Sequence, residues 1–213
     1  MSFNVSEWII RIAVLLFAVT IHEYAHGRAA LALGDPTAKN AGRLTLNPIT
    51  HIDPLGAICL IFFNFGWAKP VPVDTRYFQD MRKDTVLMAL SGPISNIAAA
   101  FVTGLFMRFY LLQSTVYQTV LIYMLVMNIG LGLFNLLPIP PLDGSHVLEN
   151  ILPPSASWKF HQIRSYAPFI LIGILILDNF LKLNILSRIL IYPIFKMAHL
   201  FGGDNFYSLI GAM

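Results

Sequence analysis

The chain has 213 residues, of which 56% are hydrophobic and only 12% are charged, and its mean hydropathy is +0.67. These values lie well outside the usage of soluble globular domains and indicate an integral membrane protein. The net charge of +3 does not indicate a nucleic-acid partner, because the basic residues form no patch interleaved with aromatic residues.

The first predicted helix covers residues 8–33 and ends at the stop signal Gly34-Asp35-Pro36. The apolar run at its start resembles a signal peptide in composition. However, no basic residue precedes the run and no small-residue cleavage site closes it. We therefore expect this helix to remain in the mature protein.

The next segment, residues 38–84, is rich in proline, glycine, asparagine and threonine. Its apolar stretch is interrupted by Gly56, Asn64 and Gly66, which makes it too short and broken for a spanning helix. We expect a small extended, β-like or re-entrant segment at the membrane face.

Two further spans are predicted over residues 85–112 and 116–136, and each exceeds the roughly 20 apolar residues that cross a bilayer. The polar break between them is short, so the two helices should be antiparallel neighbours. Beyond the second, three prolines exclude a regular helix. These are Pro138, Pro140 and Pro141.

Shorter apolar spans at residues 168–181 and 185–201 complete the pattern. The predicted fold is an all-α integral membrane protein, a polytopic helical bundle of about five spanning helices. The β-like segment follows the first helix, and residues 1–213 form a single membrane-embedded domain.

Seven basic residues lie between the first two spans, a distribution that places this connection in the cytoplasm. They are Arg28, Lys39, Arg43, Lys69, Arg76, Arg82 and Lys83. An ordinary solvated loop is compatible with the same charges. With the connection inside, the N-terminus lies outside, and the ends of helices 8–33 and 116–136 meet on the cytoplasmic side.

The first span contains the run His22-Glu23-Tyr24-Ala25-His26. An α-helix places residues four apart on one face, so both imidazoles can bind one metal ion. Glu23 stands beside them and can take a proton from a metal-bound water. Such polar groups are costly in an apolar helix unless they serve one another or a ligand. The alternative is two core histidines hydrogen-bonded to neighbouring helices.

A catalytic zinc site needs a third protein ligand and an open position. Asp143 is the best candidate, because it is the only carboxylate between Asp84 and Glu149 and follows the proline-rich end of a helix. Gly144 permits an unusual dihedral next to it. The alternative role for Asp143 is an N-cap in a turn.

Residues 135–144, with the sequence NLLPIPPLDG, look like the second signature of the site-2 protease family, and the His22 to His26 run matches the first. This resemblance covers residues 8–150. It implies an intramembrane metalloprotease with one zinc ion per chain, held by His22, His26 and Asp143, with Glu23 as the general base.

The same resemblance singles out Asn135, which matches the asparagine of the family motif. Its amide is a candidate donor to the substrate carbonyl as negative charge develops there, and helix packing is the alternative role. Residues 91–96, with the sequence SGPISN, resemble a small-residue motif on the intervening helix. For them we favour close packing over chemistry.

Residues 43–56 and 66–71 are similar to segments of compact prokaryotic members that lack PDZ or CBS domains. The resemblance therefore implies a prokaryotic inner membrane, and the distribution of basic residues places the active site nearer the cytoplasm. His51 is interpreted as a residue of the substrate entrance or as an ordinary loop histidine. His146 ranks below Asp143 as a ligand, because the motif does not require it.

The function that follows is hydrolysis of a peptide bond within a transmembrane protein or peptide, in contact with the lipid bilayer. Homo-oligomers are compatible with the sequence. Two alternatives belong to other classes: a metal-binding membrane transporter, and an inactive scaffold that holds membrane clients. The few other polar residues in the spans disfavour the transporter, and the intact Glu23 disfavours the scaffold.

Overall fold

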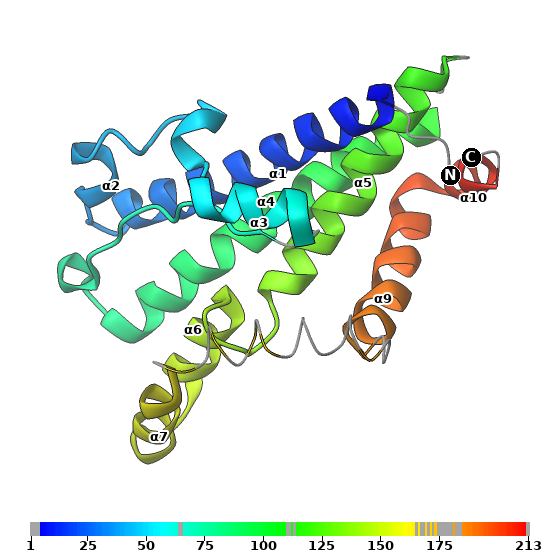
Figure 1. Ribbon diagram of the computed structural model, residues 1–213. Coiled ribbons are helices and arrows are strands. Elements are labelled where there is room, and N and C mark those ends of the chain that lie inside the picture. Colours follow the sequence, from blue (N-terminus) through cyan, green and yellow to red (C-terminus); the bar gives the residue numbers. More distant parts are fainter. Residues whose placement is uncertain are drawn as a thin grey trace.

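The computed structural model describes residues 5–63, 66–109, 112, 114–164, 166, 169, 171, 173, 181 and 185–211. Within these residues the protein is helical and has no β-sheet, as Figure 1 shows. One isolated antiparallel bridge joins Ile52 and Ala68. The prediction of an all-α protein is confirmed for the described part of the chain.

Three helices are long and apolar enough to cross a membrane: α1 (Val5–Ala32), α4 (Met81–Phe109) and α5 (Thr115–Asn135). They pack side by side, and α4 contacts both of the others. At about 1.5 Å of rise per residue, even the shortest of them matches the thickness of a bilayer core. These helices form the bundle in which the candidate site lies.

The contacts along α4 define the direction of its neighbour. Met88 of α4 meets His26 of α1, whereas Asn96 of α4 meets Ala18. Because the partner number falls as the α4 number rises, the two helices are antiparallel. The later part of α1 therefore faces the earlier part of α4.

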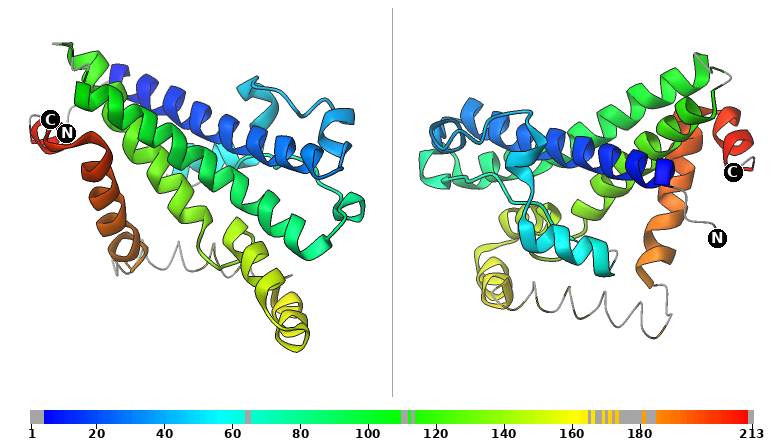
Figure 2. Two further views of the ribbon diagram at one scale, coloured as in Figure 1. Left: turned by 180° about the vertical axis from the view of Figure 1, so that it is seen from behind. Right: turned by 45° about the horizontal axis from the view of Figure 1, so that its top comes forward.

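At the opposite end of the bundle from α2 (Thr37–Asn40), helices α9 (Ile185–Gly202) and α10 (Asp204–Ile210) pack on α4 and α5. Figure 2 shows this arrangement from two sides. The core there contains fully buried Met107, Leu125 and Phe206. This apolar cluster holds α4 and α5 together at the end of the bundle that lies away from the candidate site.

Helices α6 (Asp143–Ile151) and α7 (Pro154–Arg164) follow α5. α6 packs against α4, and α7 packs against α6. The first residue of α6 is therefore brought back toward the bundle after the chain has left α5.

The connection from α1 to α4 is built from four short helices, not from a hairpin. They are α2 (Thr37–Asn40), η1 (Pro48–His51), α3 (Pro54–Phe63) and η2 (Thr75–Tyr77). The expected β-like segment is not confirmed, since the bridge between Ile52 and Ala68 is the only β pairing in the described residues of this connection. Pro70 and Pro72 follow it, and a proline has no amide hydrogen with which to continue a ladder.

The expected number of about five spans is likewise not confirmed, because three helices in the described residues meet the criteria of length and hydropathy. The helix predicted over residues 168–181 lies almost entirely outside the described residues. The helix predicted over 185–201 corresponds to α9, which is not among the three.

α4 begins at Met81, four residues before the start predicted from the uncharged run. Asp80 caps it, because its carboxylate accepts hydrogen bonds from the backbone amides of Arg82 and Lys83, both at 3.1 Å. A charged first turn thus belongs to the helix although it lies outside the apolar span.

We predict that the close contact between α4 and α9 makes Gly104 sensitive to substitution. A Cβ at Gly104 would lie 2.7 Å from the backbone carbon of Phe201. Gly104→Ala should therefore lower stability by about 1–3 kcal/mol, as overpacking does. Gly130→Ala on α5 is the matched control, because its Cβ would meet only the end of Ile194 at 3.5 Å. Unfolding in detergent micelles compares the two, and equal midpoints would contradict the contact.

Candidate metal centre

α1 carries the two histidines of the candidate centre on one face. His22 and His26 are both buried, their ring centroids lie 4.7 Å apart and the rings are nearly perpendicular, at 83°. The four-residue spacing produces this pairing directly, since it returns the second ring to the face of the first. The Nε2 atoms of the two rings are 3.1 Å apart.

Asp143 is the first residue of α6, after the proline-rich segment that follows α5, and its side chain reaches these two rings. Its Oδ2 lies 3.0 Å from Nε2 of His22 and 3.2 Å from Nε2 of His26. The next residue, Gly144, is packed so tightly that a Cβ there would lie 2.6 Å from the carbonyl oxygen of Leu137. Gly144 does not have the unusual dihedral that the sequence suggested, and glycine is required here because a side chain would collide with the backbone that leads into α6.

Hydrogen bonds on the far side of each ring define which nitrogens face the cluster. Nδ1 of His26 lies 2.9 Å from the backbone oxygen of Met88, and Nδ1 of His22 lies 2.6 Å from Oδ1 of Asn96. Both partner oxygens are acceptors, so each Nδ1 carries a proton and each neutral ring presents a lone pair at Nε2. The cluster then brings together three lone-pair atoms, two from imidazoles and one from a carboxylate.

Three such atoms repel one another unless a positive charge lies among them. Burial, the largest influence on the Asp143 carboxyl, raises its pKa. Its contacts with His22 and then His26 outweigh burial and hold this pKa well below its usual range. Asp143 is therefore ionised, and the balancing charge is either a proton on an imidazole or a metal cation.

The geometry fits a metal ion. All three ligand atoms lie within 4.8 Å of one another, and their separations of 3.0–3.2 Å approach the roughly 3.3 Å expected between ligands of a tetrahedral zinc. Gly92 of α4 faces the same atoms, and a Cβ there would lie 2.7 Å from Nε2 of His22. The absence of a side chain at Gly92 leaves the space that an ion requires.

Glu23 is not one of the three converging groups. Its Oε2 accepts a hydrogen bond of 2.9 Å from the backbone amide of Val71, in the extended segment between Ala68 and η2. The same segment is held to the end of α1 by Asp35, whose carboxylate accepts a 2.8 Å bond from the amide of Asp74. The candidate base thus faces an extended backbone beside the metal centre.

The other residues singled out by the sequence lie elsewhere. Asn135 is the last residue of α5, and its amide donates to the carbonyl oxygen of Leu131 in the same helix at 3.0 Å. His51 is buried in η1, where its Nε2 bonds to the carbonyl oxygen of Thr45 at 2.9 Å. His146 belongs to α6 but is not part of the three-ligand cluster.

Sequence reasoning missed two features of the site. The sequence favours a packing role for residues 91–96, yet Gly92 borders the ligand atoms and Asn96 bonds to His22. Two signals were present, the resemblance of residues 91–96 to a family motif and a glycine and an asparagine four residues apart in an apolar span, and both are equally compatible with packing.

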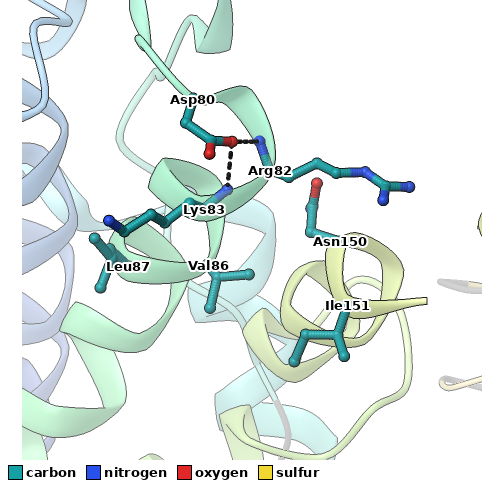
Figure 3. Close-up of a pocket in the computed structure, with 7 residues that line it drawn as sticks. All are labelled: Asp80, Arg82, Lys83, Val86, Leu87, Asn150 and Ile151. Carbon is teal, nitrogen blue, oxygen red and sulfur yellow. Dashed lines mark hydrogen bonds between the residues drawn. The ribbon is translucent and has the colours of Figure 1, made fainter. Parts of the chain in front are cut away.

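A surface recess of about 360 Å³ lies between the start of α4 and the end of α6, and Figure 3 shows it. None of the predicted site residues lines it. The one carboxylate among its lining residues, that of Asp80, already accepts hydrogen bonds from the backbone amides of Arg82 and Lys83. We therefore assign the candidate chemistry to the histidine and aspartate cluster.

The apolar helices and the buried cluster define a membrane protein with a candidate metal centre of two histidines and a carboxylate. A model of peptidase family M50 matches residues 10–176. The chain therefore belongs to peptidase family M50. This membership confirms the resemblance to the site-2 proteases and the expectation of a peptidase. No solved structure was found to match the chain.

Two relatives illustrate the similarity. YwhC of Bacillus subtilis (strain 168), named as a candidate zinc metalloprotease, is 42% identical over 73% of this chain and 74% of its own length. Rip2 of Mycolicibacterium smegmatis, with the same description, is 30% identical over 81% of this chain and 68% of its own length.

We predict that Gly92→Ala prevents metal binding without unfolding α4. The added methyl group would occupy the space beside both Nε2 atoms, whereas alanine itself favours a helix more than glycine does. Zinc content after dialysis should fall to the level of the His22→Ala, His26→Ala double variant, with unchanged helicity by circular dichroism. Gly130→Ala controls for alanine in a spanning helix. Full zinc content in Gly92→Ala would contradict the site.

Proposed function

We propose that this protein is an intramembrane zinc metalloprotease that cleaves the membrane segments of other proteins. The observation that carries the proposal is the convergence of His22, His26 and Asp143 within a bundle of apolar helices. Membership of a peptidase family supports the reaction class. The relatives named as candidate zinc metalloproteases support zinc as the metal.

The donor set suits this metal, because two imidazole nitrogens and one carboxylate oxygen leave the fourth position of a tetrahedral zinc open. Zinc held there would polarise the scissile carbonyl and acidify a water molecule. The three ligands come from α1 and the start of α6, and we propose that the substrate approaches between these elements and the connection that follows α1.

Glu23 is the proposed general base. Next to His22 on α1, it would accept a proton from the attacking water and return it to the departing amine. In the structure its carboxylate accepts the amide of Val71. We infer that this contact opens when substrate binds, because the carboxylate then has to face the attacking water.

The extended segment around Val71 is the proposed binding edge for substrate. A peptide bond within an intact helix is shielded by its own hydrogen bonds, so a membrane segment has to unwind before cleavage. The unwound backbone would lie along this segment as an added strand and donate to its carbonyl oxygens, because Pro70 and Pro72 offer no amide hydrogens. Asn135 would donate to the substrate carbonyl oxygen after its amide has left the carbonyl of Leu131.

We propose that the active site opens toward the cytoplasm, that the N-terminus lies outside and that the protein resides in a prokaryotic inner membrane. The basic residues of the connection between α1 and α4 support this orientation. A cytoplasmic opening also explains how water reaches a centre that is otherwise enclosed by apolar helices.

We predict that Glu23→Gln abolishes cleavage and leaves zinc bound. Glutamine keeps the size of the side chain but cannot take a proton, so activity on a membrane-segment substrate should fall by about 10²–10⁴-fold. Zinc content, measured by elemental analysis, should stay at one per chain. Asp143→Asn is the comparison variant, and it should lose both activity and zinc. Cleavage by Glu23→Gln at the wild-type rate would refute the proposed base.

We predict that a strong chelator abolishes cleavage and that added zinc restores it. The cluster holds three lone-pair atoms together, so protein stripped of metal should remain folded by taking up protons in its place. Cleavage assays before chelation, after chelation and after zinc addition measure this effect, with added magnesium as the control. Full activity of the stripped protein would rule out a metalloprotease.

A further inference from the structure

A chain of hydrogen bonds crosses the bundle behind His22. Asn96 of α4 is fully buried and uses its whole amide: Oδ1 lies 2.6 Å from Nδ1 of His22, and Nδ2 donates to the carbonyl oxygen of Ala18 at 2.9 Å. The same Nδ2 donates to Oδ1 of Asn128 on α5 at 3.0 Å. Asn128 is also fully buried, and its Nδ2 donates to the carbonyl oxygen of Met124 at 2.8 Å.

The orientation of both amides follows from the ends of this chain. The carbonyls of Ala18 and Met124 can only accept hydrogen bonds, so the NH2 groups of Asn96 and Asn128 must face them. Asn128 then presents its oxygen to the second N–H of Asn96. Both donors of Asn96 are used, and its oxygen is left to face His22.

The orientation of Asn96 has a direct consequence for the imidazole. An oxygen at 2.6 Å from Nδ1 accepts the ring proton there. The neutral ring then carries no proton at Nε2, the atom that lies 3.0 Å from Oδ2 of Asp143. The asparagine pair therefore favours the tautomer of His22 that can bind a metal.

We propose that Asn96, oriented by Asn128, is a positioning residue that holds His22 in its Nδ1-protonated tautomer and aims the Nε2 lone pair at the metal. This inference rests on the metal centre of the proposed function and goes beyond it by adding α5 to the elements that determine the centre. His26 has an equivalent partner in the backbone oxygen of Met88, which no substitution removes.

A packing role alone does not account for these contacts. Burying an amide in an apolar bundle is unfavourable unless its hydrogen bonds are satisfied, so an apolar residue of similar size would pack there at lower cost. Thr103, another buried polar residue of α4, satisfies its hydroxyl within its own helix, at the carbonyl oxygen of Ala99. The side-chain oxygen and nitrogen of Asn96 instead form their hydrogen bonds with α1 and α5.

The test measures zinc affinity of the full chain in detergent micelles by competition with a chromophoric chelator. Asn96→Leu should weaken zinc binding by about 10–100-fold, the range for losing a hydrogen bond to a ligating histidine. Asn128→Leu should weaken it less, because Asn96 keeps the carbonyl of Ala18. Asn96→Asp retains an acceptor for His22 and should bind zinc more tightly than Asn96→Leu. Thr103→Val, which likewise removes a buried polar group from α4, should bind zinc like the wild type.

A second readout does not depend on zinc. Nitrogen-15 NMR of histidine-labelled, metal-free protein distinguishes the tautomers, with the His22 signals identified by their loss in His22→Gln. The wild type and Thr103→Val should show His22 protonated at Nδ1, whether or not Nε2 also holds the proton that replaces the metal, and Asn96→Leu should show partial loss of the proton at Nδ1. This spectroscopic change would not follow from a loss of packing alone.

Three outcomes overturn the inference: wild-type zinc affinity in Asn96→Leu, an equal loss in Thr103→Val, or a His22 ring protonated only at Nε2 in the wild type. A wild type that binds zinc no better than the His22→Ala, His26→Ala double variant would instead contradict the proposed function. In that case the His22 tautomer still decides whether Asn96 orients the ring.

Discussion

The structure depends on one electrostatic constraint: three lone-pair atoms, from His22, His26 and Asp143, lie 3.0–3.2 Å apart among apolar helices. In water such groups would be hydrated and kept apart, but here the surrounding helices hold them together. A positive charge has to balance them. The neighbouring residues of α4 meet this need for a positive charge, since they either orient a histidine ligand or leave space for the ion.

α4 meets this constraint with three residues on a single face. Met88 offers a backbone oxygen to His26, Gly92 offers no side chain, and Asn96 offers an amide to His22. The spacing of four residues places all three toward α1, as α-helical geometry requires. The central helix therefore contributes no ligand, yet it fixes how both histidines are presented.

The parts of this design that the sequence predicts are those with a local signature. The spacing of His22 and His26 defines a shared face, and the isolation of Asp143 among apolar residues marks it as the partner. Long uncharged runs likewise locate α4 and α5. The connection between α1 and α4 could not be predicted, because its composition suits short helices and extended chain equally well. The role of Asn96 depends on Ala18 and Asn128, which are distant in sequence and become its neighbours only after folding.

Gly92 shows how the demands of folding and of the metal centre are opposed within one residue. A glycine inside a helix lowers the stability of that helix by about 1 kcal/mol relative to alanine, so helix propensity favours alanine here, provided that the two histidine rings turn away from the added methyl group. The ion needs the opposite choice, because any side chain would fill its space. A thermostability screen that ignores activity would therefore tend to enrich proteins that fold well and have lost their centre.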